Sequence, residues 1–272
     1  MSFPERLAAR TFPVALEITP PQRPLPKVLL RRARLLGDAA CAINVIQRPN
    51  RQSSLDASAE LLEAGFHPVW HLVTRGRSRT GIVSDLTRAA AIGIRQVLVI
   101  RGEHSAPDPA DAPTIRETIA LAAEHIPGVT IGATLNQYVP DRAAVLRNLF
   151  PKLAAGATYV QTQPVFDLEQ LRPFAEAIRE RDPSVGIVPM AMPLLTAEAA
   201  DRISERLKLT LPERYRARID QGEAPAWEAF DELLQALAAS DLVDGVAIMT
   251  VEMDAPAEVG ERIVQALRRA GV

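Results

Sequence analysis

The sequence predicts an α/β fold, a (β/α)8 barrel of the TIM type, from the order of its apolar segments. Eight short runs rich in β-branched residues alternate with longer amphipathic stretches rich in alanine and leucine. The alternation is uninterrupted, which favours a closed parallel barrel over an open sheet. A doubly wound sheet is the alternative, but the chain has neither a G-x-G-x-x-G turn after a strand nor a P-loop.

Each predicted strand is a short apolar run, and a predicted amphipathic helix follows it. The strands are expected near residues 14–19, 42–46, 68–74, 96–101, 130–134, 159–163, 186–191 and 245–250. The helices are expected near residues 27–36, 55–63, 79–92, 114–125, 142–154, 168–179, 197–208 and 257–269. An extra helix is predicted near residues 226–238, before the last strand. Residues 209–223 are charged and contain Pro212 and Gly222, so we interpret them as an insertion.

The composition indicates a globular protein with a sizeable core. Of the 272 residues, 47% are hydrophobic and 24% are charged, and no low-complexity tract or long linker divides the chain. We therefore predict a single domain over residues 1–272. The net charge of −2 gives no electrostatic basis for binding nucleic acid. Exposed barrel helices commonly support self-association, so the fold is compatible with a homo-oligomer.

Three features bear on the cellular compartment. The single cysteine, Cys41, excludes an internal disulfide framework and is typical of a reducing compartment. No stretch approaches the roughly 20 apolar residues of a membrane span. Residues 1–10 lack the apolar segment of a secretory signal. We expect a cytoplasmic protein with no membrane partner.

One carboxylate, Glu17, lies within an otherwise apolar strand-like segment. Burial of a charge costs several kcal/mol unless the group is paired or is retained for chemistry. Pro20 and Pro21 end the strand, so Glu17 is expected near its C-terminal end. In a parallel β/α barrel, active sites form at that end. Glu17 is therefore a candidate catalytic residue, although it could instead pair with an arginine across the barrel.

Other polar residues are expected at the C-terminal ends of the predicted strands, where they are site candidates. They are Asn44, Gln47, His71, Thr74, Arg101, Glu103, Thr134, Asn136, Gln137, Gln161 and Gln163. Gln161 and Gln163 are two residues apart, so on a strand they face the same side. A heterocycle with alternating donors and acceptors would satisfy both amides. Each residue has a structural alternative, such as a satisfied polar layer inside the barrel or, for Glu103, an ordinary surface carboxylate.

The sequence gives little support for a metal site or for a nucleophilic serine. His67 and His71 are four residues apart, but on a strand this is not the helical zinc-binding arrangement, so no metal site is predicted. Serines such as Ser78 stand in no nucleophile-elbow context. The basic loop at residues 75–79 could bind a pyrophosphate or a polyglutamate tail, or it could be a solvated loop capping the next helix.

Ordered segments of the chain resemble the methylenetetrahydrofolate reductase family, of which this would be a divergent member. They extend from residue 14 to about residue 212. The matching segments are Glu17-Ile18-Thr19-Pro20-Pro21, His71-Leu72-Val73-Thr74, residues 93–103 ending in Arg101-Gly102-Glu103, Ala155-Gly156-Ala157, Gln161-Thr162-Gln163-Pro164-Val165-Phe166-Asp167, and residues 187–193. The fold that this resemblance implies is again an eight-stranded β/α barrel.

The resemblance implies an oxidoreductase that interconverts 5,10-methylenetetrahydrofolate and 5-methyltetrahydrofolate. Glu17 would be the general acid that protonates the folate so that its ring opens to an iminium, and this needs a pKa raised by burial. Glu103 stands where the family usually has an aspartate that binds the pterin near the flavin, and it is predicted as a catalytic residue beside Glu17. Together with Glu103, the residues Gln161, Gln163 and Phe166 are the expected contacts to the tetrahydrofolate.

The resemblance also implies FAD as a cofactor that relays hydride from NAD(P)H as co-substrate. The expected FAD-binding residues are His71, Thr74, Arg101, Gly102, Thr134, Gln137 and Tyr138. The sequence departs from the family pattern after several strands, at residues 46–51, 134–140 and 249–253, and at Ala197, where the family has an aromatic residue. These departures leave two alternatives: a flavin-free pterin-binding methyltransferase or lyase on the same barrel, and a non-catalytic family member that acts as a partner subunit.

Overall fold

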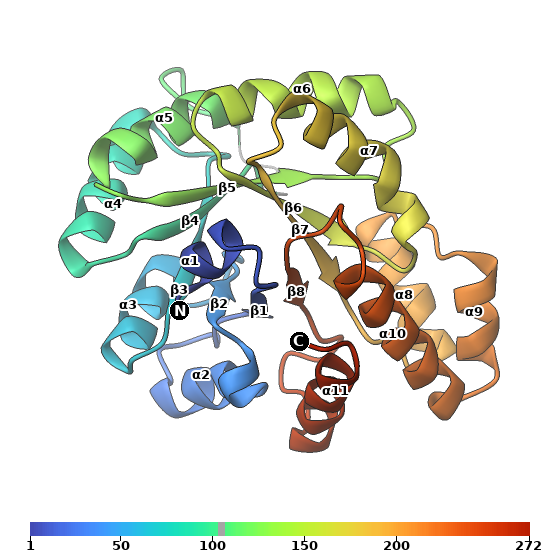
Figure 1. The fold of residues 1–272 in the computed structure, drawn as a ribbon. Coiled ribbons are helices and arrows are strands. Elements are labelled where there is room, and N and C mark those ends of the chain that lie inside the picture. The colour runs from blue at the N-terminus through green and yellow to red at the C-terminus, as the bar shows by residue number, and fades with distance from the viewer. Residues whose placement is uncertain (103–106) are drawn as a thin grey trace.

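The computed structural model, which describes residues 1–102 and 107–272, contains a closed barrel of eight parallel strands in chain order (Figure 1). The predicted barrel is therefore confirmed. The strands are β1 (Val14–Ile18), β2 (Ala42–Val45), β3 (Pro68–Val73), β4 (Gln96–Ile100), β5 (Thr130–Leu135), β6 (Tyr159–Pro164), β7 (Gly186–Ala191) and β8 (Val246–Ile248). Every strand pairs in parallel with its neighbours, and β8 closes the ring against β1.

Helices surround the strands and cover their outer face (Figure 1). They are α1 (Phe3–Ala8), α2 (Pro26–Ala33), α3 (Ser54–Glu63), α4 (Arg79–Ile92), α5 (Ile115–His125), α6 (Arg142–Ala154), α7 (Leu168–Arg181), α8 (Ala197–Leu207), α9 (Glu213–Asp220), α10 (Glu223–Ala238) and α11 (Ala257–Arg269), with a 3-10 turn η1 at Gly37–Ala39. Side-chain oxygens cap α3 to α8 by accepting backbone N–H bonds from the first turn. The capping residues are Ser53, Ser78, Thr114, Asp141, Asp167 and Thr196.

The structure differs from the sequence prediction at three helices. The extra helix before the last strand is α10, and it begins at Glu223 rather than near residue 226. The predicted insertion contains α9, whose apolar face consists of Tyr215 and Ile219 alone, too few to mark a helix in a charged stretch. The short α1 was not predicted, and it buries Phe3 alone. Within the described residues, no helix is long and apolar enough to cross a membrane.

The lower half of the barrel, where the strands begin, is filled by apolar side chains. A compact cluster joins Phe3 of α1 to interior residues of the strands, namely Ala15, Ala42, Val69, Leu98, Tyr159, Val188 and Ala247. The rings of Phe3 and Tyr159 meet edge to face at 5.5 Å. Gly132 leaves room for this, since a Cβ there would stand 2.3 Å from the Tyr159 ring. Among the described residues, the barrel interior is therefore closed at this end, and a cavity lies at the opposite one.

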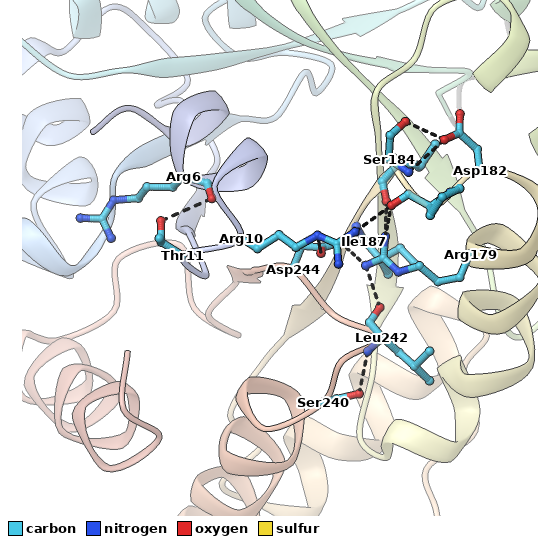
Figure 2. A network of polar contacts seen from close by, with 12 residues as sticks. Arg6, Arg10, Thr11, Arg179, Asp182, Ser184, Ile187, Ser240, Leu242 and Asp244 are labelled. Atoms are coloured by element: carbon cyan, nitrogen blue, oxygen red, sulfur yellow. Dashed lines mark hydrogen bonds and ion pairs between the residues drawn. The ribbon is translucent and has the colours of Figure 1, made fainter.

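A buried ion pair ties the start of β7 to the loop before β8 (Figure 2). Arg179 of α7 donates to the carboxylate of Asp244, which also accepts the backbone N–H of Ile187 at 2.7 Å. Arg179 donates further to the carbonyl of Val185 at 2.6 Å. The Asp244 side chain is only 5% exposed, so its charge depends on these donors. The pair thus fixes the last two strands where they enter the barrel.

Replacing Asp244 by asparagine is expected to destabilise the fold by about 3 kcal/mol, because Arg179 would keep a largely buried charge without its carboxylate. Urea unfolding of Asp244→Asn, followed by circular dichroism, measures this loss. The matched control is Asp241→Asn at an exposed position in the same loop, expected to change stability by less than about 0.5 kcal/mol. Equal effects of the two substitutions would show that the ion pair contributes little.

Candidate active site

A layer of four buried polar side chains lies directly above the apolar floor. Glu17, Asn44, His71 and Gln161 each follow a floor residue by two positions, so they face the barrel interior as well. The register confirms the layer, because Glu17 of β1 pairs with Asn44 of β2. Four polar groups in one buried layer need partners among themselves or from a ligand.

A chain of hydrogen bonds crosses this layer. Asn44 donates from Nδ2 to Oε1 of Gln161 at 2.8 Å, and Gln161 donates from Nε2 to Oε2 of Glu17 at 3.1 Å. The first bond fixes the orientation of the Gln161 amide, since its carbonyl oxygen is held by Asn44. The amide N–H groups therefore face Glu17 and the space above it. One N–H of Gln161 remains for a ligand.

The environment of Glu17 favours its protonated form. Burial raises the pKa of this carboxyl from 4.5 to about 7, while the Gln161 hydrogen bond and the nearby positive charge of Arg48 act in the opposite direction. The residue is 8% exposed. A carboxyl group with a pKa near neutrality can give and take a proton at physiological pH. Glu17 thus has the property required of a general acid.

His71 faces Glu17 from β3, with 3.9 Å between Nε2 and the Glu17 Oε2. Burial lowers the pKa of His71 to about 3, so the imidazole is neutral. The contact is therefore not an ion pair, because below pH 7 neither partner carries a full charge. Nε2 of His71 has no hydrogen-bond partner among the described residues. It is a second polar atom available to a ligand beside Glu17.

A cavity of about 440 Å³ lies above the polar layer, at the end where the strands finish. Its polar lining comes from Glu17, Gln47, Arg48, His71, Thr134, Gln161, Thr162, Gln163 and Arg206. Its walls are apolar and come from Ile46, Val73, Leu98, Ile100, Pro164, Met190, Leu207 and Met249. No phenylalanine, tyrosine or tryptophan stands among the described residues that line it. Such an apolar slot with convergent polar groups suits one flat heterocycle with a polar edge.

The residues predicted to contact substrate fall into three groups. Gln161 and Gln163 line the cavity, and Gln163 makes no side-chain hydrogen bond with described residues. Phe166 does not line the cavity, so its contact with the substrate stays a prediction that the geometry does not support. Its ring is buried against Tyr215 of α9 at 5.0 Å, because the chain turns outward after β6. Glu103 lies outside the described residues.

The residues predicted to bind FAD are likewise divided. His71, Gly102 and Thr134 line the cavity. Thr74 is fully buried away from it, and its hydroxyl has no partner among the described residues. Arg101 is exposed and pairs with Asp108. Both residues directly follow a strand end, as predicted, but neither lines the cavity, and their contacts to FAD stay predictions.

Gln137 and Tyr138 hold the end of β6 instead of facing the cavity. Gln137 donates to the carbonyls of Gln163 and Pro164 at 3.0 and 3.1 Å. The Tyr138 hydroxyl donates to the same Pro164 carbonyl at 2.6 Å. These bonds satisfy backbone acceptors at a strand end with a register shift between Gln161 and Pro164. Neither residue lines the cavity, and their contacts to FAD stay predictions.

Asn44 was one of many strand-end candidates, and the structure shows its importance through its partner across the barrel. The structure also adds two residues that the sequence did not indicate. Arg48 and Arg206 line the mouth of the cavity, from the loop after β2 and the end of α8. Isolated arginines outside any motif give no signal in a single sequence. Among residues 1–102 and 107–272, no cluster of three or more histidine, cysteine or acidic side chains could hold a metal ion.

Solved structures and a curated relative resemble this chain at low sequence identity. A protein of Clostridium thermocellum, described as binding two copies of 5-methyl-5,6,7,8-tetrahydrofolic acid, superposes with a TM-score of 0.74 at 11% identity over 99% of both chains. Tryptophan synthase from M. tuberculosis superposes with a TM-score of 0.60 at 11% identity, covering 100% of this chain and 98% of that one. These likenesses show the barrel fold alone.

The sequence comparisons are more specific. A probable methylenetetrahydrofolate reductase (NADPH) of Caenorhabditis elegans is 26% identical over 172 residues, which is 59% of this chain. The match spans about a quarter of that relative, 26% of its length. The model of the family described as methylenetetrahydrofolate reductase matches residues 3–259, nearly the whole barrel. The chain therefore belongs to the methylenetetrahydrofolate reductase family.

Proposed function

We propose that this chain is a reduced-folate oxidoreductase that interconverts 5,10-methylenetetrahydrofolate and 5-methyltetrahydrofolate. The observation that carries the proposal is Glu17, a buried carboxyl with a pKa of about 7 at the base of a slot sized for one heterocycle. Family membership and the folate bound by the Clostridium thermocellum protein support the same substrate class. We further propose that residues 1–272 form one domain.

In the proposed reaction, Glu17 acts on the folate nitrogen that leaves the bridging methylene. Protonated Glu17 gives its proton to this nitrogen, the nitrogen–carbon bond breaks, and the methylene becomes an iminium ready to accept hydride. Gln161 then stabilises the carboxylate that remains, because its N–H already points at Oε2. In the reverse direction, the same carboxylate takes the proton back.

The amides and His71 are proposed to orient the pterin. Gln161 retains one N–H, Gln163 has its whole amide, and His71 has Nε2 for bonds to the ring edge. The apolar walls exclude water from the ring faces, which strengthens these hydrogen bonds. Glu103 remains proposed as a second carboxylate of the site. Binding and proton transfer can thus be assigned to residues of this chain.

The described residues do not fit a bound FAD. Of the seven residues predicted to hold it, Thr74, Arg101, Gln137 and Tyr138 do not line the cavity. The volume of about 440 Å³ lies in the lower part of the range for single small-molecule sites, about 300–1,000 Å³. A folate and a flavin side by side would need more room. No step is therefore assigned to FAD, and FAD and NAD(P)H stay predictions about the hydride donor.

The size of the cavity, which suits one ligand, also favours a second candidate function. A slot for one ligand is what a flavin-free pterin-binding methyltransferase or lyase requires, with Glu17, Gln161 and Gln163 in the same places. A non-catalytic partner subunit is less consistent with the site, since an apolar residue would replace a buried carboxyl without loss of stability. Turnover of the two folates by the isolated chain separates these functions.

Replacing Glu17 by glutamine is expected to lower folate turnover by about 10²–10⁴-fold, because glutamine keeps the Gln161 contact but cannot donate the proton. Anaerobic assays with 5-methyltetrahydrofolate, run with and without added FAD, measure the loss. The control is Glu63→Gln, an exposed change at the end of α3. Normal turnover by Glu17→Gln would remove Glu17 from the mechanism.

The cavity also predicts that 5-methyltetrahydrofolate binds in a 1:1 ratio to protein stripped of flavin. Anaerobic calorimetry gives the stoichiometry, and a visible spectrum of the FAD-treated protein shows whether flavin is retained. Bleaching of a bound flavin by the folate would identify FAD as the hydride carrier. Folate binding that requires prior addition of FAD would contradict the conclusion that the slot takes one ligand.

Glu17 also makes the stability of the fold depend on pH. Its pKa is raised by folding from 4.5 to about 7, so the unfolded chain loses this proton first as the pH rises. The contribution of Glu17 to the free energy of unfolding is complete below pH 4.5 and is lost by pH 7. This loss amounts to about 3 kcal/mol. Glu17→Gln is expected to match the wild type at pH 4.5 and to exceed its stability by that amount at pH 8.

Urea unfolding of both proteins between pH 4.5 and pH 8 tests this dependence. Other titrating groups cancel in the difference between the two proteins. Glu63→Gln, at an exposed glutamate, should show no such divergence with pH. A constant difference over the whole range would mean that Glu17 is not held in its protonated form by the fold.

A further inference from the structure

The loop of residues 46–51 departs from the family pattern and is held beside the end of β1. At its start, the side-chain carbonyl of Gln47 accepts hydrogen bonds from the backbone N–H and the hydroxyl of Ser54, at 2.8 and 3.0 Å. At its end, Arg51 donates to the carbonyl of Pro20, just beyond β1, at 3.1 Å. The loop is thus anchored at both ends, and the residues between the anchors lie beside the strand that carries the buried carboxyl.

Arg48 is the cation of this loop between the two anchors. It is half-buried and lines the cavity above the polar layer. It also lines a smaller adjoining cavity of about 190 Å³, and Glu17 lines both of these spaces as well. The guanidinium of Arg48 makes no hydrogen bond or ion pair with residues 1–102 or 107–272. A positive charge that no other group holds therefore lies in the same space as the carboxyl.

The other charged groups that line the two cavities among the described residues are already engaged. They form the ion pairs Arg31–Asp254, Arg32–Asp254 and Arg202–Glu252. Arg206 also has a partner, and the imidazole of His71 is neutral. Burial raises the pKa of Glu17, and the hydrogen bond from Gln161 and the positive charge of Arg48 oppose this rise. Geometry and electrostatics thus point to the same cation.

We propose that Arg48 is a positioning residue for the proton transfer, the counter-charge of the Glu17 carboxylate. Its role in turnover rests on the proposed function, whereas its pairing with Glu17 needs no substrate. When Glu17 gives its proton to the folate nitrogen, the O–H bond breaks and its electron pair stays on the carboxylate. This new charge lies in a buried layer, where a carboxylate without a cation is strongly disfavoured. Gln161 supplies one N–H, and Arg48 supplies the full positive charge.

The first test measures the titration of Glu17 in the ligand-free chain by carbon-13 NMR of its glutamate carboxyl groups. The signal of Glu17 is identified by its absence from Glu17→Gln. Arg48→Gln is expected to raise the proton affinity of Glu17 about tenfold, so that the midpoint moves from near pH 7 to about pH 8. Arg48→Lys keeps the charge and should stay within about threefold of the wild type. Arg34→Gln, at an exposed arginine outside both linings, is the matched control.

The second test follows the pH dependence of 5-methyltetrahydrofolate oxidation with NAD(P)⁺ as the acceptor. In this direction Glu17 must start as the carboxylate, so the rate rises as the pH passes its midpoint. Arg48→Gln should therefore lower the rate about fivefold at pH 7 but less than about twofold at pH 9. A merely structural defect would lower the rate at every pH and leave the midpoint unchanged.

The outcomes separate this inference from the proposed function. An unchanged Glu17 titration in folded Arg48→Gln overturns the inference, even where folate binding weakens, because Arg48 would then act on the ligand alone. Equal shifts in Arg48→Gln and Arg34→Gln overturn it too, since they would report only the net charge of the chain. An upward shift specific to Arg48→Gln, in a chain that turns over no folate, supports the pairing and shows that the proposed function is wrong.

Discussion

The hydrogen-bond chain from Asn44 through Gln161 to Glu17 is the constraint on which the site depends. It joins β2, β6 and β1 across the barrel interior, so it requires the ring to be closed. Asn44 determines which end of the Gln161 amide faces the carboxyl. Reversal of this amide would place a carbonyl oxygen against Glu17 and disfavour its ionised form further. A carboxyl that must change charge during a reaction needs a donor held in place, and the barrel supplies one without using a flexible loop.

The floor beneath this layer explains why the candidate site lies at one end of the barrel. Tyr159 and Phe3 fill the interior where strand residues are small, as at Ala15 and Ala42. A ligand entering from the other end therefore stops at the polar layer. Below this polar layer, the Arg179–Asp244 ion pair holds β7 and β8 in place where they enter the barrel. The site therefore lies on a part of the fold where the floor is packed, the buried charges are paired and the ring of strands is closed.

Much of the fold could be predicted from the sequence because each strand–helix unit carries its own local pattern. Glu17 was identifiable because a lone carboxylate in an apolar strand conflicts with local preference, and such conflicts concentrate at functional sites. Phe166, Gln137 and Tyr138 do not line the cavity, although each of them follows the end of a strand. A side chain just beyond a strand can face the cavity or the helices, and local sequence does not distinguish the two. The role of Asn44 depends on a residue 117 positions away, beyond any local pattern.

The cavity carries polar groups at two levels. Glu17, His71 and Gln161 lie at its base, and Arg48 and Arg206 line its mouth. In the proposed complex, the pterin would lie over Glu17. Gln137 and Tyr138, which align with flavin-contacting positions of the family, here donate three hydrogen bonds to the carbonyls of Gln163 and Pro164. Turning them toward a cofactor would leave the Pro164 carbonyl without these donors, at a cost of about 1–3 kcal/mol. Flavin binding would therefore compete with the structure of the strand that presents Gln161 to Glu17.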